Sequence, residues 1–317
     1  MGNVLELAQE IADTVLFPAA TKVDQTGVIP ASLLDLLADK GFYGMATTAD
    51  DNAAEIVEIL ASGCLCTTFV WLQHQGVVIR VADSHLRAEW LPDLMAGRRR
   101  AGVALGGTLP GEPLLVAQPG PDGHVLNGRS PWVTGWGMVD VLAVVARDGD
   151  NLVWLLVDAK ESDTLTVDPL HMVAVTASNT VTVHFKGHHV PAGRVIKTQP
   201  YAEWAHADRA NLRFNASLAL GLTRRCLTLL GPTPLDDKLA DVRTHLDTAA
   251  PQDMPTARAR ASELAMRAAT TLVTSTGSQA IVAGQNAERL AREAMFLLVF
   301  GSRPAIKQSL VELLTRG

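Results

Sequence analysis

The stretch LNGRSPWVTGWG, residues 126–137, combines three glycines, one proline, one threonine and two tryptophans. It lies between two segments that are typical of β-strands. Two large aromatic side chains among so many conformationally permissive positions are unusual for a β-turn. We interpret Trp132 and Trp136 as candidates for contact with a flat π-system, the alternative being that Trp132 caps the core of a β-domain.

The segments around this stretch predict a β-domain at residues 101–197. The runs VDVLAVVARDGDNLVWLLVDA (139–159) and NTVTVHFKGHHVPAGRVI (179–196) are rich in β-forming residues and are interrupted by Gly, Asp and Asn. Asp148-Gly149-Asp150 marks the turn of a hairpin. We therefore expect a small antiparallel sheet in the middle of the chain.

Both flanks of this region predict helices. Apolar residues recur at helical spacing in 31–45, 53–65 and 83–97, so residues 1–100 are expected to form an N-terminal helical domain. Residues 198–317 are expected to form a C-terminal four-helix bundle, with helices at 211–231, within 255–284, at 286–300 and from Pro304, the last preceded by Ser302 as N-cap. The predicted fold class is α+β, with a helical domain, a middle antiparallel β-domain and a helical bundle in that order.

Composition limits the possible functions. Of 317 residues 48% are hydrophobic, which suits a sizeable core, and the net charge of −6 argues against a general nucleic-acid binder. The three cysteines do not suggest a disulfide framework, which favours a reducing compartment, and their spacing is not that of zinc ligands. The N-terminal residues do not resemble a signal peptide. No apolar run reaches the length of a membrane span. We expect a cytoplasmic protein without a nucleic-acid partner, a membrane span or a metal.

With this order of elements, the stretch resembles the β-domain signature of the acyl-CoA dehydrogenase family, approximately L-N-G-x-K-x-W-I-T-N-G. Leu126-Asn127-Gly128 and Trp132-Val133-Thr134 agree with it in register. Similar family sequences lie at the positions of LLADKGFYGM (36–45), R-x-x-W-L-P-x-L-x-x-G (87–97) and VPAGRVI (190–196). The resemblance covers nearly the whole chain and implies FAD bound between the β-domain and the bundle.

The resemblance assigns roles to individual residues. In the family, the Trp of the signature packs against the flavin ring and the Thr hydroxyl bonds its N5 edge, so these roles fall to Trp132 and Thr134. Thr108 is expected to face the pyrimidine ring of the flavin, and Ser302 completes the expected cofactor-binding set. Trp136 replaces a small residue of the pattern, and we expect it to fill space that a ligand would occupy.

Two ligand-binding motifs of the family are incomplete. The loop resembling T-E-P-x-x-G-S-D corresponds to GGTLPGEPLL (106–115), in which Leu109 replaces the acid and the G-S-D part is missing. The loop after the first bundle helix, which in the family clamps the ADP half of a neighbouring subunit's FAD, corresponds to GPTPLDDKLADVRTHLDTA (231–249). Here the Arg-x-x-Phe-Gly and the Gln are absent, and Asp236 and Asp237 would repel a pyrophosphate.

The catalytic base of the family is also missing, so no catalytic residue is predicted. Most members keep a Glu before a Gly-Thr/Ser between the last two bundle helices, where this chain has Phe300 or Gly301. Some relatives keep it on the first bundle helix, where this chain has Asn211. Glu293 and Asp208 are the alternative carboxylates. His184, His188 and His189 cluster at a strand end, and surface hydration is their ordinary interpretation.

These departures lead to several hypotheses. The favoured one is the base-lacking subunit of a heteromeric acyl-CoA dehydrogenase, whose partner supplies the Glu and the ADP clamp for an acyl-CoA thioester. The alternatives are a free-standing flavin oxidase or monooxygenase, a non-catalytic acyl-CoA-binding homo-oligomer, and an ordinary dehydrogenase with a relocated base. Bundle helices that are apolar around much of their circumference predict a homo- or hetero-oligomer.

Overall fold

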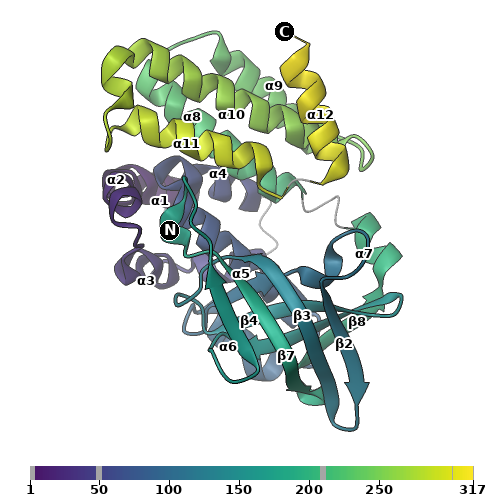
Figure 1. Ribbon diagram of the computed structural model, residues 1–317. Helices are drawn as coiled ribbons and strands as arrows, with labels where there is room; N and C mark the ends of the chain where they lie inside the picture. The colour runs from purple at the N-terminus through teal and green to yellow at the C-terminus, as the bar shows by residue number, and fades with distance from the viewer. Residues whose placement is uncertain (1–3, 48–51, 208–211, 302, 317) are drawn as a thin grey trace.

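The computed structural model describes residues 4–47, 52–207, 212–301 and 303–316. Helices at both ends of the chain flank a sheet formed by its middle part (Figure 1). This arrangement confirms the predicted α+β class. The expected residues Ser302, Asn211 and Asp208 lie outside the described residues.

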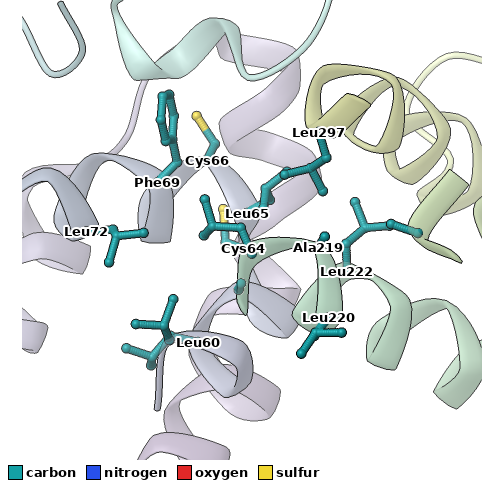
Figure 2. Close-up of a cluster of buried hydrophobic side chains, with 14 of the residues drawn as sticks. Leu60, Cys64, Leu65, Cys66, Phe69, Leu72, Ala219, Leu220, Leu222 and Leu297 are labelled. Carbon is teal, nitrogen blue, oxygen red and sulfur yellow. The ribbon is translucent and has the colours of Figure 1, made fainter. Parts of the chain in front are cut away.

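The N-terminal part packs its helices around a central, buried helix, α5. Its elements are α1 (Val4–Ile11), the π-helical η1 (Ala12–Leu16), α2 (Phe17–Thr26), α3 (Ala31–Asp39), the 3-10 helix η2 (Phe42–Thr47), α4 (Ala53–Gly63), α5 (Leu65–Ala82) and α6 (Arg87–Met95). Most residues of α4 and α5 are buried, because these helices lie against the C-terminal helices as well as each other. Figure 2 shows Leu60, Leu65 and Phe69 among the apolar side chains of this contact.

The middle part forms an eight-stranded sheet of mixed direction. Its strands are β1 (Ala101–Ala104), β2 (Leu115–Gly120), β3 (Gly123–Val133), β4 (Val141–Asp148), β5 (Asn151–Asp158), β6 (Leu165–Pro169), β7 (Val181–Pro191) and β8 (Val195–Pro200). Their order is β6-β7-β3-β2-β4-β5-β8, with β1 beside β4. The predicted hairpin is present, since Asp148 pairs with Asn151 where β4 meets β5.

The expectation of a purely antiparallel sheet is corrected by β4, which runs parallel to both β1 and β2. A parallel neighbour requires a crossover, and the chain makes it by passing through β2 and β3 between β1 and β4. β4 is buried along most of its length because α5 and α6 cover one face and strands cover the other. Its sequence is therefore a continuous apolar run rather than an alternating one.

The C-terminal part contains the expected helices and two more. Its elements are α7 (Tyr201–Ala207), α8 (Leu212–Leu230), α9 (Leu235–Thr248), α10 (Met254–Thr276), the 3-10 helix η6 (Gly277–Ile281), α11 (Asn286–Val299) and α12 (Pro304–Thr315). The additional helices are the short α7 and α9, and α9 lies in the segment that we expected to be a loop. Thr233 bonds the amide of Leu235, Asp236 bonds the amide of Thr233, and Leu239 and Leu246 are buried on one side. These are the start signal and the spacing of an amphipathic helix.

Within the described part of the chain, every helix is too short or too polar to cross a bilayer.

Candidate functional site

Within the signature stretch, the end of β3 is distorted at Trp132. The register of β3 with β7 shifts between Ser130 and Val133, which is the mark of a β-bulge. Trp132 has φ +61°, and 66% of it is exposed. A left-handed backbone is strained for a bulky residue, and such strain occurs where the surrounding structure enforces it, often at functional sites. Trp132 therefore does not cap the core of the β-domain.

Thr134 lies directly after the end of β3, two residues beyond Trp132. Its side chain is buried, and its Oγ1 lies 3.1 Å from Oγ1 of Thr180, which lies 2.8 Å from Oγ of Ser178. The sequence analysis did not single out Ser178 or Thr180. Their A-S-N-T context is typical of a turn, but no local pattern relates them to a threonine more than forty residues earlier.

A tight loop before β7 holds these hydroxyl groups in place. The 3-10 helix η4 (Thr176–Ser178) is flanked by Val175 at φ +48° and Asn179 at φ +44°. The amide of Gly135 donates to Ser178 O at 2.8 Å, and Asn179 bonds the backbone of Trp136 through both its carbonyl oxygen and its side-chain amide. The loop and the signature stretch therefore form one rigid unit.

Trp136 lies at the border of the sheet core. It is partly buried and packs against the apolar residues that include Leu126, Val144 and Phe185. The expectation that it fills space that a ligand would occupy stays a prediction.

Thr108 lies in the 3-10 helix η3 (Gly106–Thr108) and is also buried. Its hydroxyl donates to Leu105 O at 2.9 Å, so that proton is already used within the chain. Arg147 donates two hydrogen bonds to Gly107 O and stacks over Tyr201 at 3.9 Å. A Cβ on Gly107 would come within 2.7 Å of the Ala146 backbone, so glycine is required for this approach. The expected contact of Thr108 with the pyrimidine ring of the flavin stays a prediction.

Phe300, at the position that the resemblance assigns to the family's base, packs against other aromatic rings. Phe300 follows α11, and its ring centroid lies 5.0 Å from that of Phe69 and 5.4 Å from that of Phe296. The buried guanidinium of Arg258 donates to the carbonyls of Leu297 and Phe300 at 3.5 and 3.4 Å, which caps the end of α11. Neither Phe300 nor the following Gly301 has a side chain that accepts a proton.

Glu293, the nearest alternative carboxylate, has another partner. Its Oε1 lies 2.9 Å from Nη1 of Arg289, and both side chains are buried. Burial raises the pKa of Glu293, while the Arg289 guanidinium opposes that shift. A buried carboxylate held by a buried cation has a structural role, because releasing it would leave the arginine uncompensated.

The described histidines and cysteines do not form a metal site. His184 pairs with Asp168 at 2.8 Å, and His188 bonds Thr164 at 2.9 Å, both on the sheet surface. The three cysteines are buried and free, and burial raises the pKa of Cys226 to about 12. Among the residues that the structure describes, no three His, Cys, Asp or Glu side chains are grouped closely enough to hold an ion.

Comparison with known proteins identifies the architecture. No family model matches the chain. The butyryl-CoA dehydrogenase of Megasphaera elsdenii superposes with a TM-score of 0.81 at 20% identity, over 98% of this chain and 96% of that one. The chain has the acyl-CoA dehydrogenase fold. A glutaryl-CoA dehydrogenase of Mycobacterium smegmatis in complex with FADH2 gives a TM-score of 0.82 at 18% identity, over 99% of this chain and 94% of that one.

Sequence comparison agrees with this acyl-CoA dehydrogenase-like architecture. Benzylmalonyl-CoA dehydrogenase of Aromatoleum aromaticum is 26% identical over 246 residues, which is 68% of this chain and 63% of the relative. The resemblance to the family is confirmed. The chain spans between 39% and 65% of the length of the curated relatives that it matches.

Proposed function

We propose that this acyl-CoA dehydrogenase-like chain is the base-lacking subunit of an FAD-dependent acyl-CoA dehydrogenase, active only with a partner subunit. The observation that carries the proposal is the contrast between two positions. Trp132, where the family contacts flavin, is exposed, whereas Phe300, where the family has its base, is packed among aromatic rings.

The residues at the signature fit an isoalloxazine ring. Trp132 is held outward by the strained bulge, so the side chain is available to cover a flat ring at little entropy cost. Thr134, two residues later, carries a hydroxyl bonded to one partner, Thr180, among the described residues. Bound FAD would supply the hydride acceptor for α,β-dehydrogenation. This chain would contribute Trp132 and Thr134 to its orientation.

The adenosine and diphosphate half fits this chain less well. The segment corresponding to the family's clamp forms α9, and its first turn carries the acidic residues Asp236 and Asp237. A negative first turn repels phosphate oxygens instead of binding them. In the proposed assembly the partner provides the cationic clamp.

Proton abstraction from the acyl thioester would also belong to the partner. Removal of an α-proton needs a group that accepts it within about 3 Å, and Phe300, which the resemblance puts at the position of the base, has no such group. Glu293 is engaged by Arg289. We therefore expect the partner's carboxylate to serve as the base, and this chain to contribute flavin contacts and support.

Exposed apolar side chains on the C-terminal helices support a stable association of this chain with another subunit. Met295 and Val299 are one turn apart on α11 and are 43% and 68% exposed. Val311 and Leu314 are neighbours on α12, each 53% exposed. Exposed apolar groups of this kind are typical of contacts with another protein surface.

The test is the visible spectrum and activity of the purified chain, alone and co-expressed with the product of the adjacent reading frame. Flavin absorbs near 450 nm, and we expect it to appear, with acyl-CoA dehydrogenase turnover, only in the co-purified complex. Turnover by the homogeneous chain at about 1–10³ s⁻¹, as is usual for enzymes, would contradict the proposal.

A free-standing oxidase or monooxygenase is the second candidate. It is favoured by the same missing base, because flavin reactions with oxygen do not require an α-carbon base. FAD retained by the chain alone, with consumption of oxygen and no dependence on a partner, would support this candidate over the first.

A further inference from the structure

Three buried hydroxyl groups form a row behind the strand end that carries Trp132. Thr134 Oγ1, Thr180 Oγ1 and Ser178 Oγ lie in succession, separated by 3.1 and 2.8 Å. All three residues are at most 4% exposed. We call these three side chains the hydroxyl row.

The number of protons in the row exceeds the number of bonds that it contains. Each hydroxyl carries one proton, and the row has two internal hydrogen bonds, so one terminal proton is left over. If Thr180 donates to Ser178, the unused proton belongs to Ser178. If Thr180 donates to Thr134, then Ser178 donates to Thr180 and the unused proton belongs to Thr134.

The two ends differ in what they can reach. Ser178 is fully buried, and its hydroxyl bonds only Thr180 among the described residues, so a proton left there would be an unsatisfied buried donor. Thr134 lies two residues from the exposed Trp132, beside the proposed position of a ligand.

We propose that Ser178 and Thr180 are positioning residues that direct the Thr134 proton outward, toward a ring nitrogen or carbonyl acceptor of bound flavin. The inference rests on the proposed function, because the acceptor is the oxidised isoalloxazine edge. Ser178 donates to Thr180, Thr180 donates to Thr134, and Thr134 donates to the ligand. Hydrogen bonds in such a chain polarise one another, so the outer bond is strengthened by the inner two.

The strained loop around η4 holds the side chains of the hydroxyl row in position. Val175 is a β-branched residue at φ +48°, a conformation that persists only when neighbours enforce it. Cys66 Sγ donates to Val175 O at 3.5 Å, and Arg292 donates to Val173 O at 3.2 Å. These contacts tie the loop to α5 and α11, so the position of Ser178 is set by the helices on which the loop rests.

The test replaces the middle hydroxyl in the FAD-bound protein, purified with its partner if the partner is needed for binding. Thr180→Val keeps the shape and removes the hydroxyl, Thr180→Ser restores it, and Thr182→Val is a matched change two residues along β7. Thr134→Val is the reference for complete loss of the outer bond. The readouts are the ¹⁵N chemical shift of flavin N5 in labelled FAD and the FAD dissociation constant.

We expect Thr180→Val to move the N5 shift part of the way toward the Thr134→Val value and to weaken FAD binding about twofold, less than the roughly five- to tenfold that corresponds to loss of one whole neutral hydrogen bond in Thr134→Val. Thr180→Ser should restore both values, and Thr182→Val should leave both unchanged. A Thr180→Val protein with the wild-type N5 shift, beside a Thr134→Val protein that lacks it, would overturn this inference and leave the proposed function standing. If the wild type binds no FAD, alone or with its partner, both are wrong.

Discussion

At the scale of single residues, Trp132 is held in a strained, left-handed backbone conformation. Its indole is two-thirds exposed, so burial of the ring contributes little to holding the backbone at φ +61°. The conformation must therefore be imposed by the bulge between Ser130 and Val133. This strain, without a packing benefit within the chain, supports the proposed contact of Trp132 with another molecule.

We predict that Trp132→Gly is more stable than Trp132→Ala by about 0.5–1 kcal/mol. The left-handed conformation costs an L-residue roughly 1–2 kcal/mol, and the greater freedom of glycine in the unfolded chain offsets about 0.5–1 kcal/mol of that gain. Both variants lack the indole, so both should bind FAD more weakly than the wild type. Chemical denaturation and flavin titration measure the two effects. Equal stability of the two variants would show that the bulge relaxes when the ring is removed.

We predict that Phe300→Glu does not restore dehydrogenase activity in the lone chain. A base needs an oriented thioester and a bound flavin as well as a carboxylate, and the new side chain would lose the ring contacts with Phe69 and Phe296. Phe300→Gln is the matched neutral control for packing and polarity. Turnover that appears in Phe300→Glu and not in Phe300→Gln would show that the ligand sites of this chain are complete.

At the scale of elements, His74 links two helices to the sheet. Its Nδ1 accepts the amide of Ala101 at the start of β1, so Nε2 carries the proton and donates to Leu94 O of α6, each at 3.0 Å. Burial lowers the pKa of His74 to about 3. The ring is thus held neutral, and protonation would break the bond to β1.

We predict that this link makes the fold sensitive to acid. The pKa of His74 is about 3 in the folded chain and near 6.5 in the unfolded one. The contribution of neutral His74 to the free energy of unfolding is therefore fully present above about pH 6.5. It is lost as the pH falls toward 3, by about 1.4 kcal/mol per pH unit. Denaturation at several pH values should give a shallower slope for His74→Gln, whereas His171→Gln, at an exposed site, should leave the slope unchanged. Parallel slopes for all three proteins would exclude His74 as the cause.

At the scale of the whole molecule, the bundle surface carries apolar side chains that the chain itself does not cover. The i, i+4 pair Met295 and Val299 and the i, i+3 pair Val311 and Leu314 are both exposed on the last two helices. A second subunit that packed there would remove the cost of exposing them to water.

We predict that the chain is a homodimer when expressed alone and a heterotetramer with its partner. Light scattering measures the mass directly. Met295→Lys with Val299→Lys should shift the species toward the 33.8 kDa monomer, because burying two ammonium groups in an interface is unfavourable. Ile281→Lys, at an 83% exposed position on η6, is the control. A monodisperse wild-type monomer at micromolar concentration, unchanged by co-expression, would exclude the assembly and the shared-site mechanism.

The sequence alone determined the succession of a helical part, a β-rich part and a second helical part. The signals for the helices and for the signature are contained in short stretches of sequence. Apolar residues recur at helical spacing in α11 and α12, and glycines stand close to Trp132 and Thr134. The extra helix α9 was missed because its start signals stand in a segment with few apolar residues. The hypothesis of a missing base also came from the sequence, because it concerns which residue type stands at one position.

Only the tertiary structure decided how these residues are used. Ser178 and Thr180 meet Thr134 because β7 is aligned with β3, where Val133 pairs with Val181. Glu293 forms a buried ion pair because folding places Arg289 beside it, away from water. The outward direction of Trp132 depends on a bulge created by the register of two strands distant in sequence. Local propensity cannot specify such contacts, since strand register and desolvation exist only after distant segments pack together.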